Sequence, residues 1–536
     1  MLLARLVETS AALVATSSRN AKIALVADAL RAAGSGLARA DAEGADDATS
    51  VEARPVEAGS EARCGEAGLV AAYLSTVVPQ RRLGIGWRGA ADLPEPAADA
   101  SLTLTDVDEA FEEMARAAGP GSTTARRAAF DALMGRATAA EQDYLRGLIL
   151  GGVRQGAQDG VMLAAIAQAA GVPLAAVQRA VMLAGFAGPV AQAALAGGEA
   201  ALAAVRLEVG RPLRPMLAGS APDVAAVVTG EEEVILERKI DGIRIQAHKS
   251  GGVVRLFTRS LDEITERLPE VVDVVAALPA EDIVLDGETV AVRPDGRPEP
   301  FQVTGSRTAS STDPAQLRVT TPLATSFFDL LHLDGVDLLD LPLADRIARL
   351  DALLPPDARI PRERLSDARE AAAFFAAQVA AGHEGVIVKD PRSPYAAGRR
   401  GAGWVKVKPR HTLDLVVLAV EWGSGRRRGL LSNIHLGARD PRTDEFVMLG
   451  KTFKGMTDAM LAWQTERFQE LEVRRDAYTV HVRPEQVVEI AFDAIQRSSR
   501  YPGGMALRFA RVLRYRDDKS AAQADTLDTV VALRGW

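Results

Sequence analysis

Cysteine is almost absent from this chain of 536 residues, which contains only Cys64. One thiol cannot form an internal disulfide framework, and it cannot supply a zinc site built from several thiolates. Long apolar runs are also missing near the N-terminus, where charged residues such as Arg5 and Glu8 divide the hydrophobic positions. This spacing predicts a pair of amphipathic helices and argues against a secretory signal or a membrane span. We therefore expect a protein of a reducing compartment, the cytoplasm, and the high Ala, Gly and Arg content is consistent with a GC-rich prokaryotic genome.

The chain also lacks a net positive charge, since its formal charge at pH 7 is −8. A negative total ordinarily argues against a nucleic-acid partner, because phosphate binding depends on clustered lysine and arginine. The basic residues are, however, concentrated in residues 399–410, 426–428 and 497–519, whereas much of the acid lies in residues 41–66. Each cluster alone is typical of a solvated face, but their distribution is compatible with a nucleic-acid partner.

The length predicts about three to four domains, each able to bury a core. Residues 1–206 are rich in alanine and leucine at helical spacing, which predicts an all-helical domain. Within it, the small-residue and acidic stretch from Gly34 to Gly68 is expected to be a loop. Three prolines between Arg211 and Asp223 then predict an extended connection to the next domain.

The remaining residues change to short β-rich runs separated by turns. Residues 207–410 combine such runs with a few helices and predict an α+β domain. Residues 411–536 contain further short strands and one helix around Met456 to Glu472, which predicts a small β-barrel of the OB-fold type. An SH3-like barrel is the alternative for this last domain. The expected fold class is multidomain, with no internal repeat of fixed period.

A lysine stands directly before an Asp-Gly step in the run from Glu237 to Arg244. An Asp-Gly step turns the backbone tightly. Lysine is a nucleophile when uncharged, a form that burial or neighbouring cations favour. Lys239 is therefore the candidate nucleophile. The K-x-D-G pattern is weak by itself, because about 0.1 chance matches are expected in a chain of this length, and a hairpin with an exposed lysine is the alternative.

Several residues further along the chain have side chains suited to nucleotide chemistry. Phe328 can stack its ring on a base, although one aromatic residue in a strand more often belongs to a core. Glu288 and Glu384 offer oxygen atoms to Mg²⁺, whereas isolated strand glutamates are usually solvated. In the run WVKVK, the two-residue period of a strand puts the tryptophan, Lys406 and Lys408 on one face and both valines on the other. The two ammonium groups can then meet a triphosphate.

The order of these elements resembles the nucleotidyltransferase superfamily of ligases and capping enzymes, and most closely the ATP-dependent DNA ligases. The similarity covers nearly the whole chain and includes KIDG at Lys239, LDGE ending at Glu288, EGVIVK beginning at Glu384, and WVKVK. It implies that Lys239 is catalytic and that Glu288 and Glu384 are metal ligands. The residues that it places around the nucleotide are Glu237 at the adenine edge, Arg244 near the ribose and phosphates, Arg259, Glu288, the adenine-stacking Phe328, Arg400, Lys406 and Lys408.

The segment from Leu507 to Lys519 in the last domain resembles the sixth motif of the same family. The resemblance implies that this domain swings until its cations contact the departing pyrophosphate, and then swings away to embrace DNA. Two positions depart from the family pattern, because Ser260 stands where Asn is common and Ala510 stands where Pro is common. Neither change removes a charged group. The cations that the resemblance assigns to pyrophosphate contact and closure are Arg508, Arg511, Arg514 and Lys519.

The reaction that the resemblance implies is the sealing of 5′-phosphate/3′-hydroxyl nicks by three phosphoryl transfers. The lysine attacks the α-phosphate of ATP, AMP passes to a DNA 5′-phosphate, and the adjacent 3′-hydroxyl displaces AMP. The implied cofactors are ATP and Mg²⁺, with Mn²⁺ as the alternative metal. The implied partner is nicked duplex DNA. The protein is expected to bind it as a monomer and not to associate with a membrane. A sliding clamp or repair factor is compatible with this role, but no motif in the sequence identifies one.

Three related classes of protein compete with this assignment. Capping enzymes share the lysine but lack a large helical module before it, whereas residues 1–206 are similar to the ligase domain that grips the minor groove and backbone of DNA. NAD-dependent ligases carry a four-cysteine zinc site, which a single cysteine cannot supply. A DNA-binding scaffold without turnover is disfavoured because the lysine, both carboxylates and the paired lysines are all present.

Overall fold

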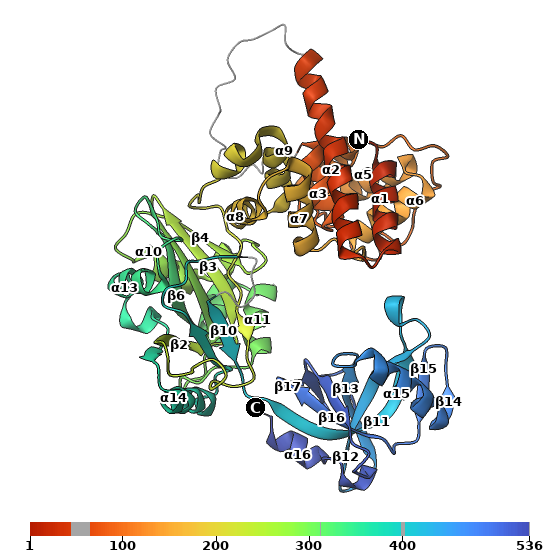
Figure 1. Cartoon of the computed structure of the whole chain (residues 1–536), viewed down its shortest axis with the longest axis vertical. Helices are drawn as coiled ribbons and strands as arrows, with labels where there is room; N and C mark the ends of the chain where they lie inside the picture. Colours follow the sequence, from red (N-terminus) through yellow and green to blue (C-terminus); the bar gives the residue numbers. More distant parts are fainter. Residues whose placement is uncertain (44–64, 311, 398–402, 535–536) are drawn as a thin grey trace.

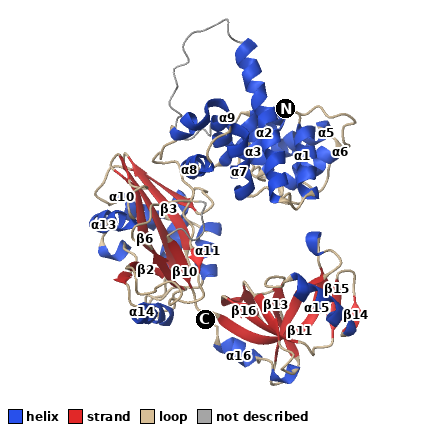
Figure 2. Ribbon diagram, in the orientation of Figure 1, coloured by secondary structure: helices blue, strands red, loops and turns tan. Residues whose placement is uncertain are grey.

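The structure is a computed structural model of the chain that describes residues 1–43, 65–310, 312–397 and 403–534. Figure 1 shows three bodies in chain order: a helical one at the top, a mixed one at the lower left and a strand-rich one at the lower right. Figure 2 shows that helices dominate the first body and that strands form the centre of the other two. The expected order of a helical region, an α+β region and a strand-rich region is confirmed.

The N-terminal region is a packed set of helices, several of which begin at side-chain caps. Thr103 and Thr138 each form a reciprocal capping box with the acidic residue three positions later, which satisfies backbone N–H groups at the helix start. Helix α2 packs on α7, and α3 packs on α9. The helices are α1 (Leu3–Ala15), α2 (Arg19–Glu43), α3 (Glu66–Leu74), α4 (Leu104–Arg116), α5 (Ser122–Arg136), α6 (Ala139–Ile149), α7 (Asp159–Ala170), α8 (Leu174–Ala184) and α9 (Ala187–Ala203).

The prediction of a loop from Gly34 to Gly68 is wrong at both ends of this range. Helix α2 continues to Glu43, and α3 already begins at Glu66. The alanines, arginines and leucine in this part of the sequence favour helix strongly enough to outweigh two glycines, and Gly34 lies close to Leu195 of α9. Residues 44–64, which include Cys64, lie outside the described part of the chain.

The middle region is built on two five-stranded sheets that pack face to face. One sheet has the order β1-β10-β9-β2-β8 and the other has the order β4-β3-β5-β6-β7. The strands are β1 (Gly219–Ser220), β2 (Val234–Lys239), β3 (Ile243–Ser250), β4 (Val253–Thr258), β5 (Ile283–Ala291), β6 (Leu323–Leu333), β7 (Val336–Asp337), β8 (Arg362–Leu365), β9 (Gly385–Lys389) and β10 (Trp404–Val407).

Helices cover the outer faces of these sheets. Buried residues of α10 pack with β3, β4 and β5, whereas α14 packs against β2 and β9. Phe328 of β6 and Trp404 of β10 meet in the apolar layer between the sheets. The helices are α10 (Pro269–Ala276), α11 (Phe301–Ala309), α12 (Pro314–Thr320), α13 (Leu343–Leu353) and α14 (Ala368–Ala380), with short 3₁₀ turns η1 (Thr265–Arg267) and η2 (Pro356–Ala358).

The C-terminal region is a sheet organised around one long strand. Strand β11 pairs with β16 along its first half, with β15 along its second half, and with β12 on the opposite edge. The helix expected around Met456 to Glu472 is confirmed as α15, which covers the core of this sheet. The elements are β11 (His411–Trp422), β12 (Leu431–Arg439), β13 (Phe446–Thr452), α15 (Asp458–Glu470), β14 (Glu472–Arg475), β15 (Thr479–Val482), β16 (Val487–Phe492), β17 (Ala494–Arg497), β18 (Met505–Arg508), β19 (Arg511–Tyr515), α16 (Leu527–Ala532), η3 (Gly425–Arg427) and η4 (Ala521–Gln523).

An apolar junction joins the helical region to the middle region. Met182 and Leu183 at the end of α8 lie in the same buried cluster as Leu213 and Met216 of the connecting segment. The backbone N–H of Arg214 donates to the carbonyl of Met182 at 2.9 Å. The predicted extended connection is confirmed, and it is fixed on both sides by hydrogen bonds and by burial.

Among the described residues, no single helix is long and apolar enough to cross a membrane. In the part of the chain that the structure describes, one pair of helices, α7 and α8, reaches the required length and composition together, and these two helices are bent by 119° to each other.

Candidate active site

Lys239 ends strand β2, and the chain then crosses from one sheet to the other. Strands β2 and β3 belong to different sheets, so the Asp-Gly step is a crossing turn and the alternative of a simple hairpin is wrong. A Cβ atom on Gly242 would lie 2.2 Å from the carbonyl oxygen of Thr289. Only glycine fits this close approach, which brings the lysine turn against strand β5.

Glu384 joins two of the predicted lysines. Its carboxylate contacts Nζ of Lys239 through one oxygen and Nζ of Lys408 through the other. The backbone N–H of Glu384 also donates to the carbonyl of Lys239 at 3.0 Å. Burial alone would raise the pKa of Glu384, but the two ammonium groups lower it below its ordinary value. Glu384 is therefore held as a carboxylate in direct contact with the candidate nucleophile.

Glu288 approaches the lysine turn from strand β5. Its Oε1 atom accepts a hydrogen bond from the backbone N–H of Gly242 at 2.9 Å. Burial raises the pKa of Glu288, and the nearby charge of Lys239 and the bond from Gly242 offset this rise only in part. A cation that enters the site would therefore favour the ionised form of this carboxyl group.

Two further cations lie on the side of the lysine where phosphates are expected. Burial lowers the pKa of Lys406, and the positive charges of Lys408, Lys239 and Arg259 lower it further. An anion bound among these positive charges would raise the pKa of Lys406 again. Lys406 is therefore close enough to Lys408, Lys239 and Arg259 to sense their charges, and the phosphate contacts expected of these residues stay predictions.

The predicted adenine side of the site contains a buried ion pair. Glu237 is 1% exposed and lies 2.5 Å from Nζ of Lys389. Arg362 approaches its Oε1 atom to 3.4 Å, yet Oε1 has no hydrogen-bond partner in the described part of the chain. Burial lowers the pKa of Lys389, although Glu237 opposes this shift. An unsatisfied buried acceptor of this kind suits an N–H donor such as the amino group of adenine.

Aromatic rings form the wall beside this ion pair. Phe328 and Trp404 meet edge to face with their ring centroids 5.8 Å apart. Nζ of Lys389 lies 4.7 Å from the Phe328 centroid and 4.1 Å from the Trp404 centroid. Phe328 is 8% exposed. It therefore packs in the core against Trp404 and also lies next to Lys389, the partner of Glu237.

Arg244 is rigidly held below these rings. Its guanidinium group forms a bidentate pair with Asp286, with Nε 2.9 Å from Oδ1 and Nη2 2.5 Å from Oδ2. Nη1 donates to the carbonyl of Met216 at 2.7 Å, and the hydroxyl of Tyr395 donates to Asp286 at 2.7 Å. Burial alone would lower the pKa of Arg244, but Asp286 raises it above its ordinary value. Most of the donors of Arg244 are therefore already used within the protein.

The C-terminal region reaches the lysine turn through one arginine. Nη1 of Arg508 lies 2.5 Å from Oδ2 of Asp241, the residue between Ile240 and the turn glycine. Asp493, between β16 and β17, lies 3.2 Å from Nζ of Lys408. These contacts bring a strand-rich domain onto the same lysines that Glu384 holds.

The other cations of the predicted closure motif lie elsewhere in this arrangement. Nε of Arg514 lies 2.7 Å from Oε2 of Glu489, and Nζ of Lys519 lies 2.5 Å from Oδ2 of Asp414. Arg511 is exposed on strand β19. Of the four predicted cations, the structure thus brings only Arg508 to the turn of the candidate nucleophile. Arg400, predicted to contact the nucleotide, lies outside the described residues.

Three family descriptions match consecutive parts of the chain. The DNA ligase N terminus matches residues 2–167, the ATP dependent DNA ligase domain matches residues 215–408, and the ATP dependent DNA ligase C terminal region matches residues 427–519. The chain belongs to the ATP-dependent DNA ligase family. The enzymes of this family join DNA strands through a lysine–AMP intermediate. The predicted family is confirmed, and the match before residue 200 removes the capping-enzyme alternative.

Similar proteins cover the ligase from end to end. A probable DNA ligase of Nocardioides sp. is 57% identical over 537 residues, covering 100% of this chain and 99% of the relative. A probable DNA ligase of Beutenbergia cavernae is 57% identical over 544 residues and covers 100% of both chains. The solved structure named Pmar-Lig_Pre is 18% identical, with a TM-score of 0.57, and covers 96% of this chain and 99% of that one. The last similarity concerns the fold.

The carboxylates of the ligase suit a magnesium ion. Within the described residues, no group of three or more His, Cys, Asp or Glu side chains surrounds a metal position. Mg²⁺ in nucleotide sites, however, uses one or two carboxylates together with phosphates and water. Glu288 and Glu384 both approach Lys239, and they provide this kind of donor set.

Four residues of the ligase site were not among those predicted from the sequence. Lys389 pairs with Glu237, Asp286 pairs with Arg244, Asp241 pairs with Arg508, and Asp493 pairs with Lys408. All four had a visible signal, because Asp241, Asp286 and Lys389 lie inside the runs KIDG, LDGE and EGVIVK, and Asp493 interrupts the apolar run IAFDAIQ. A charged residue inside an apolar run requires a partner when it is buried.

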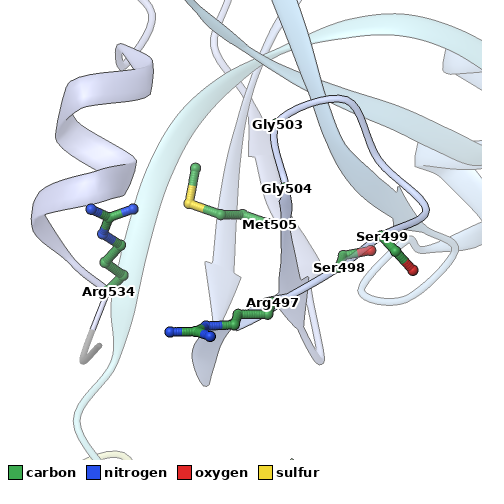
Figure 3. A pocket seen from close by; sticks show the side chains of 7 residues that line it. All are labelled: Arg497, Ser498, Ser499, Gly503, Gly504, Met505 and Arg534. Carbon is green, nitrogen blue, oxygen red and sulfur yellow. The ribbon is translucent and has the colours of Figure 1, made fainter.

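A shallow pocket of the ligase lies apart from these residues. Figure 3 shows Arg497 and Ser498 on one side of the β17–β18 hairpin, with Met505 between them and Arg534 of the C-terminal helix end. Its volume is about 520 Å³. None of the residues around Lys239 lines this pocket, so it is separate from the candidate active site.

Proposed function

We propose that Lys239 is the residue that this ligase adenylates. The observation that carries the proposal is that its ammonium group contacts Glu384, which also contacts Lys408, while Arg508 of the C-terminal domain pairs with Asp241 in the adjoining turn. A lysine used only for solubility would not be surrounded in this way. This arrangement supports a nucleophile that works on a phosphate group.

The first chemical step follows from this arrangement. Nζ of Lys239 bonds to the α-phosphorus of ATP, and the bond from that phosphorus to the bridging oxygen of pyrophosphate breaks. The resting ammonium is paired with Glu384, so the attacking amine forms when this pair separates and the proton leaves to solvent. Lys406, Lys408 and Arg259 face the phosphates and stabilise the negative charge that develops on the leaving group.

The adenine base and ribose are bound on the other side of the lysine. We propose that the Oε1 atom of Glu237, which accepts no hydrogen bond within the described residues, accepts one from the adenine amino group while Phe328 contacts the base. Arg244, which Asp286 holds in place, lies below the ribose and α-phosphate. The pair with Lys389 holds the Glu237 carboxylate in place.

The next two steps transfer AMP to DNA and then release it. The DNA 5′-phosphate attacks the adenylate phosphorus and Lys239 leaves. The 3′-hydroxyl across the nick then attacks the DNA phosphorus, and AMP departs. Arg508 holds the C-terminal domain against the lysine turn in the preceding step, and the domain then swings away to embrace the DNA. Arg511, Arg514 and Lys519 are proposed to contact pyrophosphate in another orientation of the same domain.

We propose that Glu288 and Glu384 hold Mg²⁺, with Mn²⁺ as an alternative metal. When bound, the ion neutralises charge on the phosphates and orients them. The raised pKa of Glu288 supports this assignment, because a cation beside this buried carboxyl group would favour its ionised form.

The proposed domains are a DNA-binding domain of residues 1–206, an adenylation domain of residues 207–410 and an OB-fold domain of residues 411–536. The pairing of β11 with β12, β15 and β16, together with the covering helix α15, supports the OB-fold. Three domains can surround a nicked duplex without a second copy. We therefore propose a monomer that acts in the bacterial cytoplasm, where its DNA lies.

The test uses ATP labelled at the α-phosphate, Mg²⁺ and nicked duplex DNA. The label is expected to attach to the wild-type chain and then to pass to the 5′-phosphate of the nick. The matched control is Lys239→Arg, which keeps a positive charge beside Glu384 but cannot form the adenylate. Equal labelling of Lys239→Arg would refute the assignment. Label that attaches to the enzyme but passes only to a nicked RNA would refute the DNA substrate.

A further inference from the structure

A short turn carries Arg259 into the active site. It connects β4 to η1, and it is closed by a hydrogen bond from the backbone N–H of Leu261 to the carbonyl of Thr258 at 2.9 Å. The Ser260 hydroxyl donates to Asp262 at 2.5 Å and lies 2.9 Å from the hydroxyl of Thr258. The position of the Arg259 side chain therefore depends on how this turn is held.

The helical domain holds the turn through Arg81, in the segment that follows α3. Nη1 of Arg81 donates to the carbonyl of Leu261 at 2.5 Å and to Oδ1 of Asp262 at 3.2 Å. The guanidinium carbon of Arg81 also lies 4.9 Å from the ring centroid of Phe186, between α8 and α9. One side chain thus joins two segments of the helical domain to the turn that carries Arg259.

The backbone at this contact is strained on both sides. Arg81 has φ 56° and Leu261 has φ 69°, values in the left-handed region that residues other than glycine rarely adopt. Such conformations persist where the surrounding structure determines them. Leu261 is 5% exposed, and a Cβ atom on Gly185 would lie only 3.1 Å from its Cδ1 atom. The helical domain therefore packs closely against the turn and also binds its carbonyl group.

We propose that Arg81 is a positioning residue for Arg259, so that docking of the helical domain sets the phosphate-facing side of the adenylation site. The inference rests on the proposed function in one respect, since it takes Arg259 to contact the phosphates. It assigns to the helical domain a part in the chemistry in addition to DNA binding. Arg81 itself contacts the turn and not the reacting atoms.

The effect on the rate follows from the geometry. A displacement of a phosphate-binding group by about 1 Å costs up to about a hundredfold in rate. Without Arg81 the Leu261 carbonyl loses its donor and the turn is free to relax. We expect Arg81→Ala to slow the step that uses Arg259 by about tenfold or more, with little change in nick binding.

The experiment compares four full-length variants in single-turnover adenylation with labelled ATP and in sealing of nicked DNA by the preformed adenylate. The variants are Arg81→Ala, Arg259→Ala, the double variant and Arg179→Ala. Arg179 is the matched control, because it also joins the helical domain to the adenylation domain, through Asp340 at 2.7 Å, but lies on a different segment. Arg81→Lys replaces Arg81→Ala if the latter fails to fold.

The expected result is that Arg81→Ala slows the same step as Arg259→Ala, that the double variant is no slower than Arg259→Ala, and that Arg179→Ala is close to wild type. Multiplying defects in the double variant would overturn the inference, because the two arginines would then act independently. A normal Arg81→Ala beside an impaired Arg259→Ala would overturn it as well. A normal Arg259→Ala would instead remove the proposed role of Arg259.

Discussion

The two junctions of the adenylation domain are built in different ways. Toward the helical domain, Met182 and Leu183 are buried with Leu213 and Met216 of the connecting segment. Toward the C-terminal domain, the contacts are polar: Arg508 pairs with Asp241, Lys408 pairs with Asp493, and the side chain of Gln302 donates to the carbonyl of Arg497 at 3.2 Å. The first junction has a core, whereas the second contains ion pairs, a hydrogen bond and a cation–π contact of Arg508 with Phe301.

This difference indicates which parts of the ligase move. An apolar junction separates only at the cost of exposing its side chains to water. Partly exposed ion pairs exchange readily with water and salt, and each is worth little. The first two domains are therefore expected to act as one unit. The C-terminal domain is able to leave the site and to present Arg511, Arg514 and Lys519 in another orientation.

The largest expected effect comes from breaking the polar junction. Arg508→Ala removes the contact of the C-terminal domain with Asp241, and adenylation of the enzyme by ATP should slow by about a hundredfold. The melting temperature should stay unchanged, because the pair is partly exposed. Rapid-quench adenylation assays and calorimetry measure the two quantities. Arg483→Ala, which breaks an exposed pair with Glu485 in the same domain, should leave both at wild-type values; an equal loss of activity in this control would contradict the prediction.

Breaking the apolar junction should have the opposite pattern. Leu213 is 0% exposed, and Leu213→Ala should lower the free energy of unfolding of the first two domains by about 2–5 kcal/mol. Denaturant titration followed by fluorescence measures this change. Leu174→Ala is the matched control on α8, because Leu174 is 40% exposed and should cost less than about 1 kcal/mol. Similar costs for the two variants would show that the junction lacks a core.

The apolar junction should also be sensitive to acid. His248 accepts a hydrogen bond at Nδ1 from the backbone N–H of Gly210 in the connecting segment, at 2.9 Å. Burial lowers the pKa of His248 to about 3, so between pH 6.5 and this value the imidazole is protonated in the unfolded chain but not in the folded chain. The contribution of His248 to the free energy of unfolding is therefore fully present above pH 6.5 and falls by about 1.4 kcal/mol per pH unit below it. Denaturant titrations between pH 7 and pH 4 should show a smaller slope for His248→Gln; an unchanged slope would contradict the assignment.

The smallest effect is expected from the exposed ion pair at the first junction. Arg179 and Asp340 are 48% and 72% exposed, and such pairs contribute about 0–1 kcal/mol, which salt screens further. Arg179→Ala should therefore change the melting temperature by no more than a few degrees. A scan at low and high salt checks this prediction. A large, salt-dependent loss would show that the first junction also depends on charge.

The sequence predicted the strands of the site well, because their apolar runs are long and strongly patterned. The two-residue alternation in WVKVK is confirmed, since Trp404 packs with Phe328 while Val407 packs on the other side with Val386 and Val388. The short strands β8 and β14 gave no such pattern, because each has four residues and is largely polar. Helix α2 was predicted too short because Gly34 and Gly36 were taken to indicate a loop, although the residues around them favour a helix.

Contacts between distant segments were the part that the sequence could not supply. Nothing near Arg508 indicates that it pairs with Asp241, since the two residues are brought together only by the packing of two domains. The burial of Lys389 beside Glu237 likewise depends on the pairing of β2 with β9. The sequence pattern located the lysine, carboxylates and cations, whereas the tertiary structure determined which of them meet.

The most direct test of the account is to locate the AMP on the chain. The wild-type ligase is incubated with ATP and Mg²⁺, digested at neutral pH, and its peptides are identified by tandem mass spectrometry. The account predicts one AMP adduct, on the peptide that contains Lys239, which disappears when nicked DNA is added. An adduct on another lysine, or an adduct on Lys239 that nicked DNA does not remove, would contradict it.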